Sequence, residues 1–376
     1  MLQSRPDTAR SAARAAALLL ALPLFTGAPS ALAQPAPPTP EAKPTTTGAE
    51  EEGIEDIIPG GVNTEVPPRI VEDDKGILTF QLENDLFTGT DRHYTNGVRF
   101  SYLSAENSVP DWVRRAARPL PFFPDEGNLR VAYALGQTMH TPEDITIKEA
   151  QPDERPWAGF TWGTVGLTND AGDRLDSLEL ILGMVGPASQ ADDTQEFVHD
   201  LIDTTDPSGW DNQLHNEPII NLSYKRTWRR WIESEALGLE MDAAPYVGGA
   251  LGNAFTHVNG GVMLRLGDDL PADYGPPRIR PTLPGSDFFV PQQNFGWYIF
   301  AGVDGRLVAR NIFLDGNTFR DSASVDKNWL VGEMQAGVAV TVGDVRVAYT
   351  HVVRSREFEG QDDLDRFGAL SVSLRF

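Results

Sequence analysis

The chain has 376 residues, no cysteine and a formal net charge of −23 at pH 7, so it holds no disulfide, zinc–cysteine site or thiol nucleophile. The acidity also argues against a nucleic-acid-binding protein, because phosphate binding needs a basic face. Apolar residues make up 40% of the sequence. No uninterrupted apolar run approaches the roughly 20 residues of a membrane-spanning helix, which excludes a helical membrane protein.

The N-terminal region has the composition of an export signal followed by a tail. Within residues 1–33, three arginines precede an apolar run over residues 15–25, and the small residues Ala31-Leu32-Ala33 provide a cleavage site. We therefore expect residues 1–33 to be a signal peptide. Residues 34–70 are rich in Pro, Thr and Glu and poor in large apolar side chains, which predicts a disordered tail.

Residues 71–376 change to segments of roughly ten residues with apolar side chains at alternate positions, the signature of transmembrane strands that face lipid and lumen in turn. In the last segment Leu370, Val372, Leu374 and Phe376 share one face, which we expect to contact lipid. The pattern predicts an all-β fold, a 12-stranded antiparallel transmembrane β-barrel. The expected strands lie near residues 77–84, 95–104, 129–137, 157–168, 173–185, 216–226, 235–249, 254–266, 296–308, 329–342, 344–354 and 366–376.

A soluble lipocalin-like barrel or sandwich would alternate in the same way. Aromatic residues near the predicted strand ends favour the membrane barrel, because they suit interfacial girdles; these are Trp157, Trp162, Trp228, Trp231, Tyr298 and Trp329. The short connections at 169–172 and 343–344 resemble periplasmic turns. Longer connections are expected at the exterior, where function would lie; these are 105–128, 138–156, 186–215, 267–295 and 309–328.

One of the long connections carries a helix-like stretch in which Gln195 and His199 are four residues apart, so their side chains face the same way. The apolar residues between and after them, Phe197 and Val198 among them, would rest on the barrel rim. A loop histidine is most often only solvated. The alternative is a general base, because an imidazole titrates near neutrality and can take a proton from water.

A second group of polar residues joins the first two strands, where Glu83-Asn84-Asp85 precedes a polar stretch over residues 90–97. Hard oxygen ligands gathered in this way suit calcium, although Asn, Asp, Thr and Gly are also the residues that ordinary turns prefer. In another loop, Lys148 is placed to meet an anionic head group or a developing oxyanion, but loop lysines are usually only solvated. Spacing alone leaves these alternatives open.

From about Gly76 to Phe376 the chain resembles the lipid A 3′-O-deacylases of Gram-negative outer membranes. The matching pieces, in order, are Leu82-Glu83-Asn84-Asp85, Asp91-Arg92-His93-Tyr94-Thr95-Asn96-Gly97, Gly136-Gln137 with Thr141-Pro142, Arg155-Pro156-Trp157-Ala158-Gly159, Gly186-Pro187 with Gln195 and His199, Gly209-Trp210-Asp211-Asn212-Gln213, and Asp315-Gly316-Asn317. The resemblance implies a 12-stranded barrel with a short exterior loop helix. It also implies a site at the outer rim, between the wall and that helix, and a mechanism similar to that of secreted calcium-dependent phospholipases.

The resemblance also implies roles for individual residues. These are Asn84 and Asp85 as metal ligands for Ca²⁺, Thr95 in the active-site wall, Lys148 beside the ester or a lipid phosphate, and Gln195 and His199 on the helix. His199 would be the base that activates water. After His199 the match weakens, because the family has an acidic residue and a tyrosine where this chain reads Asp203-Thr204-Thr205-Asp206-Pro207. Asp203 and Asp206 are the candidates to support the base.

The expected function is therefore calcium-dependent hydrolysis of the 3′-linked acyl or acyloxyacyl ester of lipid A, at the outer rim of a barrel in the bacterial outer membrane. The expected partners are lipid A within lipopolysaccharide and the lipid bilayer. Two alternatives stay open. One is a non-enzymatic barrel, either a small porin or a structural protein, and the other is an esterase that acts on phospholipids with the same residues.

Overall fold

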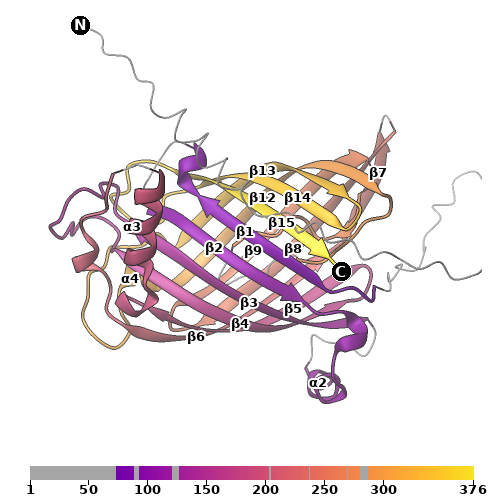
Figure 1. Ribbon diagram of the computed structural model, residues 1–376, viewed down its shortest axis with the longest axis horizontal. Coiled ribbons are helices and arrows are strands. Elements are labelled where there is room, and N and C mark those ends of the chain that lie inside the picture. Colours follow the sequence, from indigo (N-terminus) through magenta and orange to yellow (C-terminus); the bar gives the residue numbers. More distant parts are fainter. Residues whose placement is uncertain are drawn as a thin grey trace, which may run out of the picture.

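The computed structural model describes residues 73–88, 93–120, 127–202, 205–236, 238–268, 270–279 and 287–376. The expected signal peptide and tail, residues 1–70, lie outside the described residues. The strands of the barrel are β1 (Ile77–Asn84), β2 (His93–Leu103), β3 (Asn128–Thr141), β4 (Ala158–Asp170), β5 (Arg174–Val185), β6 (Glu217–Trp228), β8 (Leu239–Gly252), β9 (Phe255–Asp268), β12 (Phe295–Asn311), β13 (Leu330–Val342), β14 (Val345–Arg354) and β15 (Asp365–Arg375). Neighbouring strands are antiparallel, and the ring closes where β1 pairs with β15 (Figure 1).

The predicted 12-stranded antiparallel barrel is confirmed, and each predicted strand has a counterpart whose ends differ by a few residues. Three shorter strands were not predicted. β7 (Ile232–Ala236) extends the sheet by pairing with β8, beyond the stretch of β8 that pairs with β6. β10 (Ala272–Asp273) and β11 (Phe289–Val290) pair only with each other.

The facing predicted for the last strand is also confirmed. In β15, Val372 and Leu374 are exposed on the outer wall, whereas Ser371 and Ser373 are buried inside. The hydroxyl of Thr79 donates a hydrogen bond to Ser373 Oγ across the β1–β15 seam, at 2.9 Å. Apolar side chains therefore face lipid and polar side chains face the lumen, as a membrane barrel requires.

The predicted aromatic girdle is only partly present. Trp231 and Trp329 are exposed, as interfacial side chains should be. Trp157, Trp162 and Tyr298 are buried, so these three rings serve as packing anchors and not as lipid contacts. The prediction was wrong for them because a strand end gives no indication of which face a residue occupies unless the register is known.

A segment between β9 and β12 lies inside the barrel. This lumenal segment consists of residues 270–279 and 287–291. The Asp273 carboxylate pairs with Arg265 on β9 and with Arg346 on β14, the latter at 2.7 Å. Tyr298 on β12 donates its hydroxyl to the same carboxylate at 2.8 Å. All four side chains are buried, so Asp273 is held in the lumen by three strands of the wall.

Two further charged residues fix the lumenal segment. Arg278 pairs with Glu83 on β1 at 3.2 Å and with Glu333 on β13 at 2.5 Å. Asp287 accepts two hydrogen bonds from the guanidinium of Arg99 on β2, each at 3.1 Å. Because each buried charge has an opposite charge beside it, burial of the segment does not leave these groups uncompensated.

The two ends of the barrel carry different connections. The turns at 171–173 and 343–344 lie at one end with Phe376, whereas α3 (Ala191–Ile202) and α4 (Ile312–Asp315) lie at the other (Figure 1). Antiparallel strands alternate in direction, so the connections 105–128 and 267–295 lie at the same end as the short turns. Their predicted exterior placement beside the loop helix was wrong.

The helices are short compared with the strands. α2 (Asp111–Ala117) lies at the end that carries the C-terminus, away from α3 (Figure 1). No helix in the described part of the chain is long and apolar enough to cross a membrane. The short loop helix expected over Gln195 and His199 is α3.

Candidate active site

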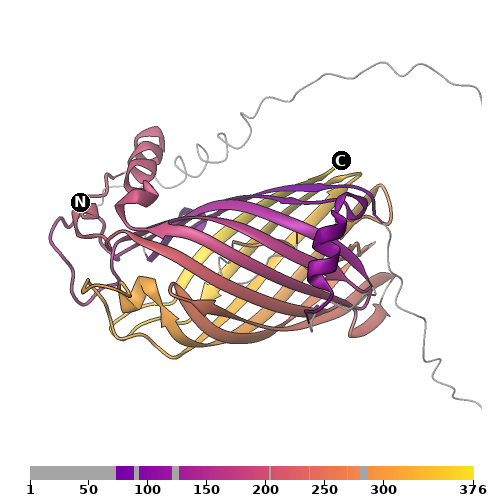
Figure 2. The same ribbon diagram turned by 90° about the horizontal axis from the view of Figure 1, so that it is seen from below.

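The helix α3 stands outside the barrel wall, at the end opposite the C-terminus (Figure 2). Its start lies directly against β4 because Gly159 has no side chain. A Cβ atom at this position would overlap Ala191 and Ser189. Gln137 and Thr161, on β3 and β4, both donate hydrogen bonds to the carbonyl oxygen of Ser189, at 2.8 and 2.7 Å. Residues of the wall therefore fix the place where the helix begins.

The face that α3 turns to the protein is polar. Gln195 and His199 are only 2% and 4% exposed, and Ala191, one turn earlier, is also buried. Phe197 is 67% exposed, so the prediction that this residue rests on the barrel rim was wrong. A helix that buries an amide and an imidazole needs hydrogen-bond partners for them.

Those partners form a directional chain of hydrogen bonds. Trp210 donates its indole N–H to Gln195 Oε1 at 2.8 Å, and Gln195 Nε2 lies 3.4 Å from His199 Nε2. On the other side of the ring, His199 Nδ1 lies 2.6 Å from the carbonyl oxygen of Thr205. Since a carbonyl only accepts, Nδ1 carries the hydrogen, and in the neutral ring Nε2 keeps its lone pair. The chain thus sets both the amide orientation and the imidazole tautomer.

The support of His199 differs from the expectation. Asp203 lies outside the described residues, and Asp206 is exposed. The partner of Nδ1 that the structure gives is the main-chain carbonyl of Thr205. A carbonyl can orient a histidine as a carboxylate does, although it brings no negative charge.

Trp210 is the residue of this site to which the sequence analysis gave no role. It occurs in one of the matched pieces, and its ring lies 5.0 Å from that of Trp157, tilted by 58°. Both indoles are buried. Only Trp210 donates to the buried amide, since Trp157 Nε1 has no hydrogen-bond partner among the described residues. A buried indole N–H needs a hydrogen-bond acceptor. In the sequence, this general requirement was the only indication that Trp210 would donate to a neighbouring side chain.

Thr95 lies where the register of β2 shifts against β3. Its hydroxyl is 2.8 Å from the hydroxyl of Thr141, and both side chains are buried. The residue after it, Asn96, pairs with Asn84 at the end of β1, and Asp85 follows directly. Thr95, Asn84 and Asp85 therefore lie at one corner of the rim.

This corner and α3 share the end of β3. Thr141 follows Met139 by two residues on β3, so both side chains lie on the same face of the sheet. Met139 packs in one buried cluster with Ala191 and Trp210. The outer face at the end of β3 thus has Thr95 on one side and the start of α3 on the other.

The side-chain oxygen atoms of Asn84 and Asp85 are of the type that calcium binds. A carboxylate, an amide oxygen and nearby main-chain carbonyls are hard oxygen ligands, and Asp85 is 1% exposed at the start of the 3₁₀ turn η1 (Asp85–Thr88). The described residues contain no group of three or more His, Asp or Glu side chains suited to a metal. A calcium ion here would take many of its ligands from carbonyls, water and substrate.

Lys148 lies on the periphery of the site. Its side chain is exposed, and its carbonyl oxygen accepts a hydrogen bond from Asn212 at 2.7 Å, which joins its loop to the loop that follows α3. Earlier in the same loop, Asp144 accepts hydrogen bonds from the N–H and hydroxyl of Thr146. These bonds lower the pKa of the Asp144 carboxyl group. The structure does not bring Lys148 into the buried chain around His199.

Comparisons with known proteins give one family and one fold. The family model described as "Outer membrane protein LpxR" matches residues 48–376. The solved structure of LpxR from Salmonella typhimurium is 19% identical, covers 80% of this chain and 100% of its own, and has a TM-score of 0.65. The β-domain of the Bordetella autotransporter BrkA is 10% identical over 80% of this chain and 97% of its own, with a TM-score of 0.37. Comparison with curated proteins gave no match.

Proposed function

Because this chain belongs to the LpxR family of outer membrane proteins, which modify lipid A, we propose that it hydrolyses the 3′-linked acyl or acyloxyacyl ester of lipid A with the help of calcium. The observation that carries the proposal is the buried chain from Trp210 through Gln195 and His199 to the Thr205 carbonyl. It leaves one imidazole nitrogen as a base on the side of α3 that faces the barrel wall.

The reaction that suits this arrangement is attack of water on the ester. His199 Nε2 takes a proton as the water oxygen bonds to the carbonyl carbon. The bond between that carbon and the sugar oxygen then breaks, and the imidazolium returns the proton to the sugar oxygen. The products are a carboxylic acid and a lipid A hydroxyl group. The Thr205 carbonyl accepts from Nδ1 throughout and so favours the imidazolium that forms.

Gln195 holds the base in place before water arrives. The distance of 3.4 Å between its amide nitrogen and His199 Nε2 is long for a hydrogen bond, whose usual range ends near 3.2 Å. A water molecule can therefore take over the lone pair at little cost, while Trp210 keeps the amide from turning its oxygen toward the ring.

Calcium is proposed at Asn84 and Asp85, whose oxygens are the hard donors it prefers. When bound, the cation supplies electrostatic stabilisation of the negative charge that develops on the ester oxygen. Thr95 contributes a hydroxyl to the adjoining wall. Lys148, with its exposed side chain, suits a phosphate group of lipid A.

A porin is disfavoured by the interior of the barrel. The lumenal segment crosses the space that ions would need, and its buried charges are paired with the wall. A purely structural barrel has no use for a polar helix face buried at the rim. A phospholipid ester would meet the same base, so this substrate class is decided by the experiment below.

The test is mass spectrometry of lipid A and phospholipids from Gram-negative cells that express the protein. Wild type should remove the mass of the 3′-linked group and release the matching acid, with phospholipids unchanged. His199→Ala should abolish this change, and Glu196→Ala, on the exposed side of the same helix, should not. Unchanged lipid A in cells that hold the assembled barrel would refute the proposal. Accumulated lysophospholipid would assign the activity to phospholipids instead.

A further inference from the structure

A groove of about 440 Å³ lies on the lipid-facing wall of β3, β4 and β5. It exists because Gly163, on β4, interrupts a row of large outward side chains. Gly163 pairs with Leu135 on one side and with Leu182 on the other. The large side chains that line the groove are exposed; they are Tyr133, Leu135, Val165, Leu180 and Leu182.

The groove continues the surface on which α3 stands. Three residues at every second position of β4, Gly159, Thr161 and Gly163, lie on its outer face. Gly159 receives the start of α3, and Thr161 binds the Ser189 carbonyl that precedes it. Four strand residues from Gly159 to Gly163 span about 13 Å. His199 lies eight residues along α3 from Ala191, or about 12 Å, so base and groove are within the reach of one lipid molecule.

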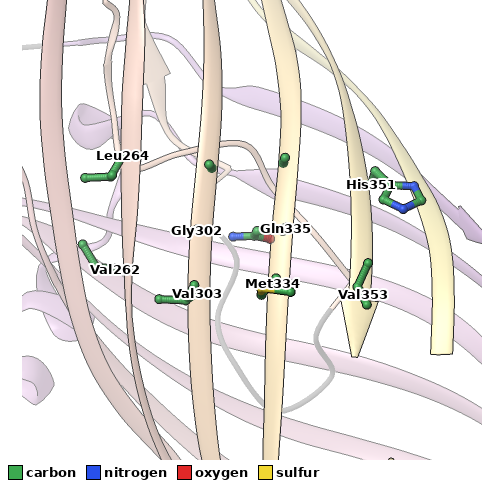
Figure 3. Close-up of a pocket in the computed structure, with 10 residues that line it drawn as sticks. Val262, Leu264, Gly302, Val303, Met334, Gln335, His351 and Val353 are labelled. Atoms are coloured by element: carbon green, nitrogen blue, oxygen red, sulfur yellow. The ribbon is translucent and has the colours of Figure 1, made fainter. Parts of the chain in front are cut away.

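A second groove, on a part of the wall away from α3, shows that an apolar groove by itself does not identify a binding site. It measures about 350 Å³ and is lined by residues of β9, β12, β13 and β14 (Figure 3). It arises in the same way, because Ala301 and Ala336 pair with each other between Leu264 and His351. The helix α3 contacts β3 and β4, and in the order of the sheet β2, β1 and β15 separate these from β14 and the other strands of the second groove. Of these two grooves, the one at Gly163 adjoins the candidate site.

We propose that the groove at Gly163 holds an acyl chain of the lipid A molecule whose ester lies at His199. This rests on the proposed function and adds a second point of recognition to it. An acyl chain that enters the groove gives up contacts with other lipid tails and was not in water before. Its binding therefore depends on close packing against the groove and not on the removal of apolar surface from water. The groove therefore selects substrates by the shape and length of the acyl chain.

Gly163 offers a direct way to fill the groove. A Cβ atom there would make ordinary contacts, 3.5 Å from Leu135 Cδ2 and 3.7 Å from the Ala134 carbonyl oxygen, so the first atom of a side chain fits without overlap. The series Gly163→Ala, Gly163→Leu and Gly163→Phe should lower kcat/KM progressively. The leucine variant should lose about tenfold, which corresponds to the loss of roughly ten carbon–carbon contacts. Ala336→Leu, in the remote groove, is the matched control and should change nothing.

The closing experiment does not depend on hydrolysis. Lipid A with a diazirine on an acyl chain is photo-crosslinked to the His199→Ala protein, with a diazirine phospholipid in parallel, and the labelled peptides are mapped. We expect lipid A to label peptides of β3–β5 several-fold more than those of β12–β14, the phospholipid to label both equally, and Gly163→Phe to abolish the preference. Equal labelling by lipid A, or equal kinetic loss from Gly163→Leu and Ala336→Leu, would overturn the groove. A preference found in a wild-type protein that cannot hydrolyse lipid A would refute the proposed function and keep the groove.

Discussion

Replacement of Trp210 by phenylalanine tests the hydrogen-bond chain through a residue that does not touch the reacting atoms. The change removes the indole N–H that donates to Gln195 Oε1 at 2.8 Å and keeps an aromatic ring in the cluster. The amide then has no donor for its oxygen and is free to turn that oxygen toward His199 Nε2. An amide oxygen there would compete with the attacking water for the imidazole and favour its protonated form.

The magnitude follows from burial. Gln195 is 2% exposed and Trp210 is 8% exposed, so water cannot easily replace the lost donor. A buried acceptor left without a partner costs about 1–3 kcal/mol. If half of the middle of that range, about 1 kcal/mol, reaches the transition state, kcat/KM falls by about fivefold. The loss should appear mainly in kcat, because the acyl groove and the lipid head-group contacts are untouched.

Trp157 provides the matched control. Its ring lies 5.0 Å from that of Trp210, it is also buried, and its indole nitrogen has no hydrogen-bond partner among the described residues. Trp157→Phe therefore removes the same ring atoms without removing a hydrogen bond. The assay is the rate of lipid A deacylation in detergent micelles as a function of pH, with heat-modifiable mobility as the check on assembly.

The two variants must differ in their deacylation rates and pH profiles if the hydrogen bond from Trp210 orients the amide. We expect Trp210→Phe to lose rate and to shift the acidic limb of its pH profile upward, and Trp157→Phe to keep both within about twofold. Equal losses in the two variants would show that Trp210 only fills space. A pH profile that does not move, with the rate lost, would refute the reorientation of the amide.

The remaining predictions concern the base, the cation and the lumen. His199→Ala should assemble normally and lower the deacylation rate by roughly 10²–10⁴-fold; near-full activity would remove it as the base. Chelation should stop deacylation and added calcium restore it, whereas Asp85→Ala should resist rescue; indifference to chelator would leave Asp85 as part of an ordinary turn. Wild type should conduct no ions in planar bilayers, but Arg278→Ala, which leaves the buried Glu83 without its cationic partner at a cost of about 3–5 kcal/mol, should loosen the lumenal segment and open a pore. A conducting wild type would contradict a filled lumen.

The strands were predictable because their signal is local and periodic. Lipid and lumen impose opposite demands on alternate residues, and Ser371, Val372 and Ser373 show this within three positions. The lumenal segment gave no such signal, because it is rich in proline and its charges resemble those of a solvated loop. Its place inside the barrel depends on ion pairs with strands far away in the sequence, which no local pattern reports.

The candidate site was predictable only in part. The resemblance placed Gln195 and His199 on a helix, and the structure brings them together on one buried face. The orientation of the helix was missed because Phe197 is apolar yet exposed. The Thr205 carbonyl could not be inferred, since every residue carries a carbonyl and only the fold selects which one meets the imidazole.

The lumenal segment also has a consequence for assembly. Its partners are drawn from the first strands, through Glu83 and Arg99, and from later ones, through Glu333 and Arg346. Those two groups of strands become neighbours only when β15 pairs with β1. A slip of one residue at that seam would turn inward side chains outward and leave buried charges without counterions. The lumenal segment therefore stabilises the barrel that closes in the correct register and disfavours a barrel that closes in a shifted one.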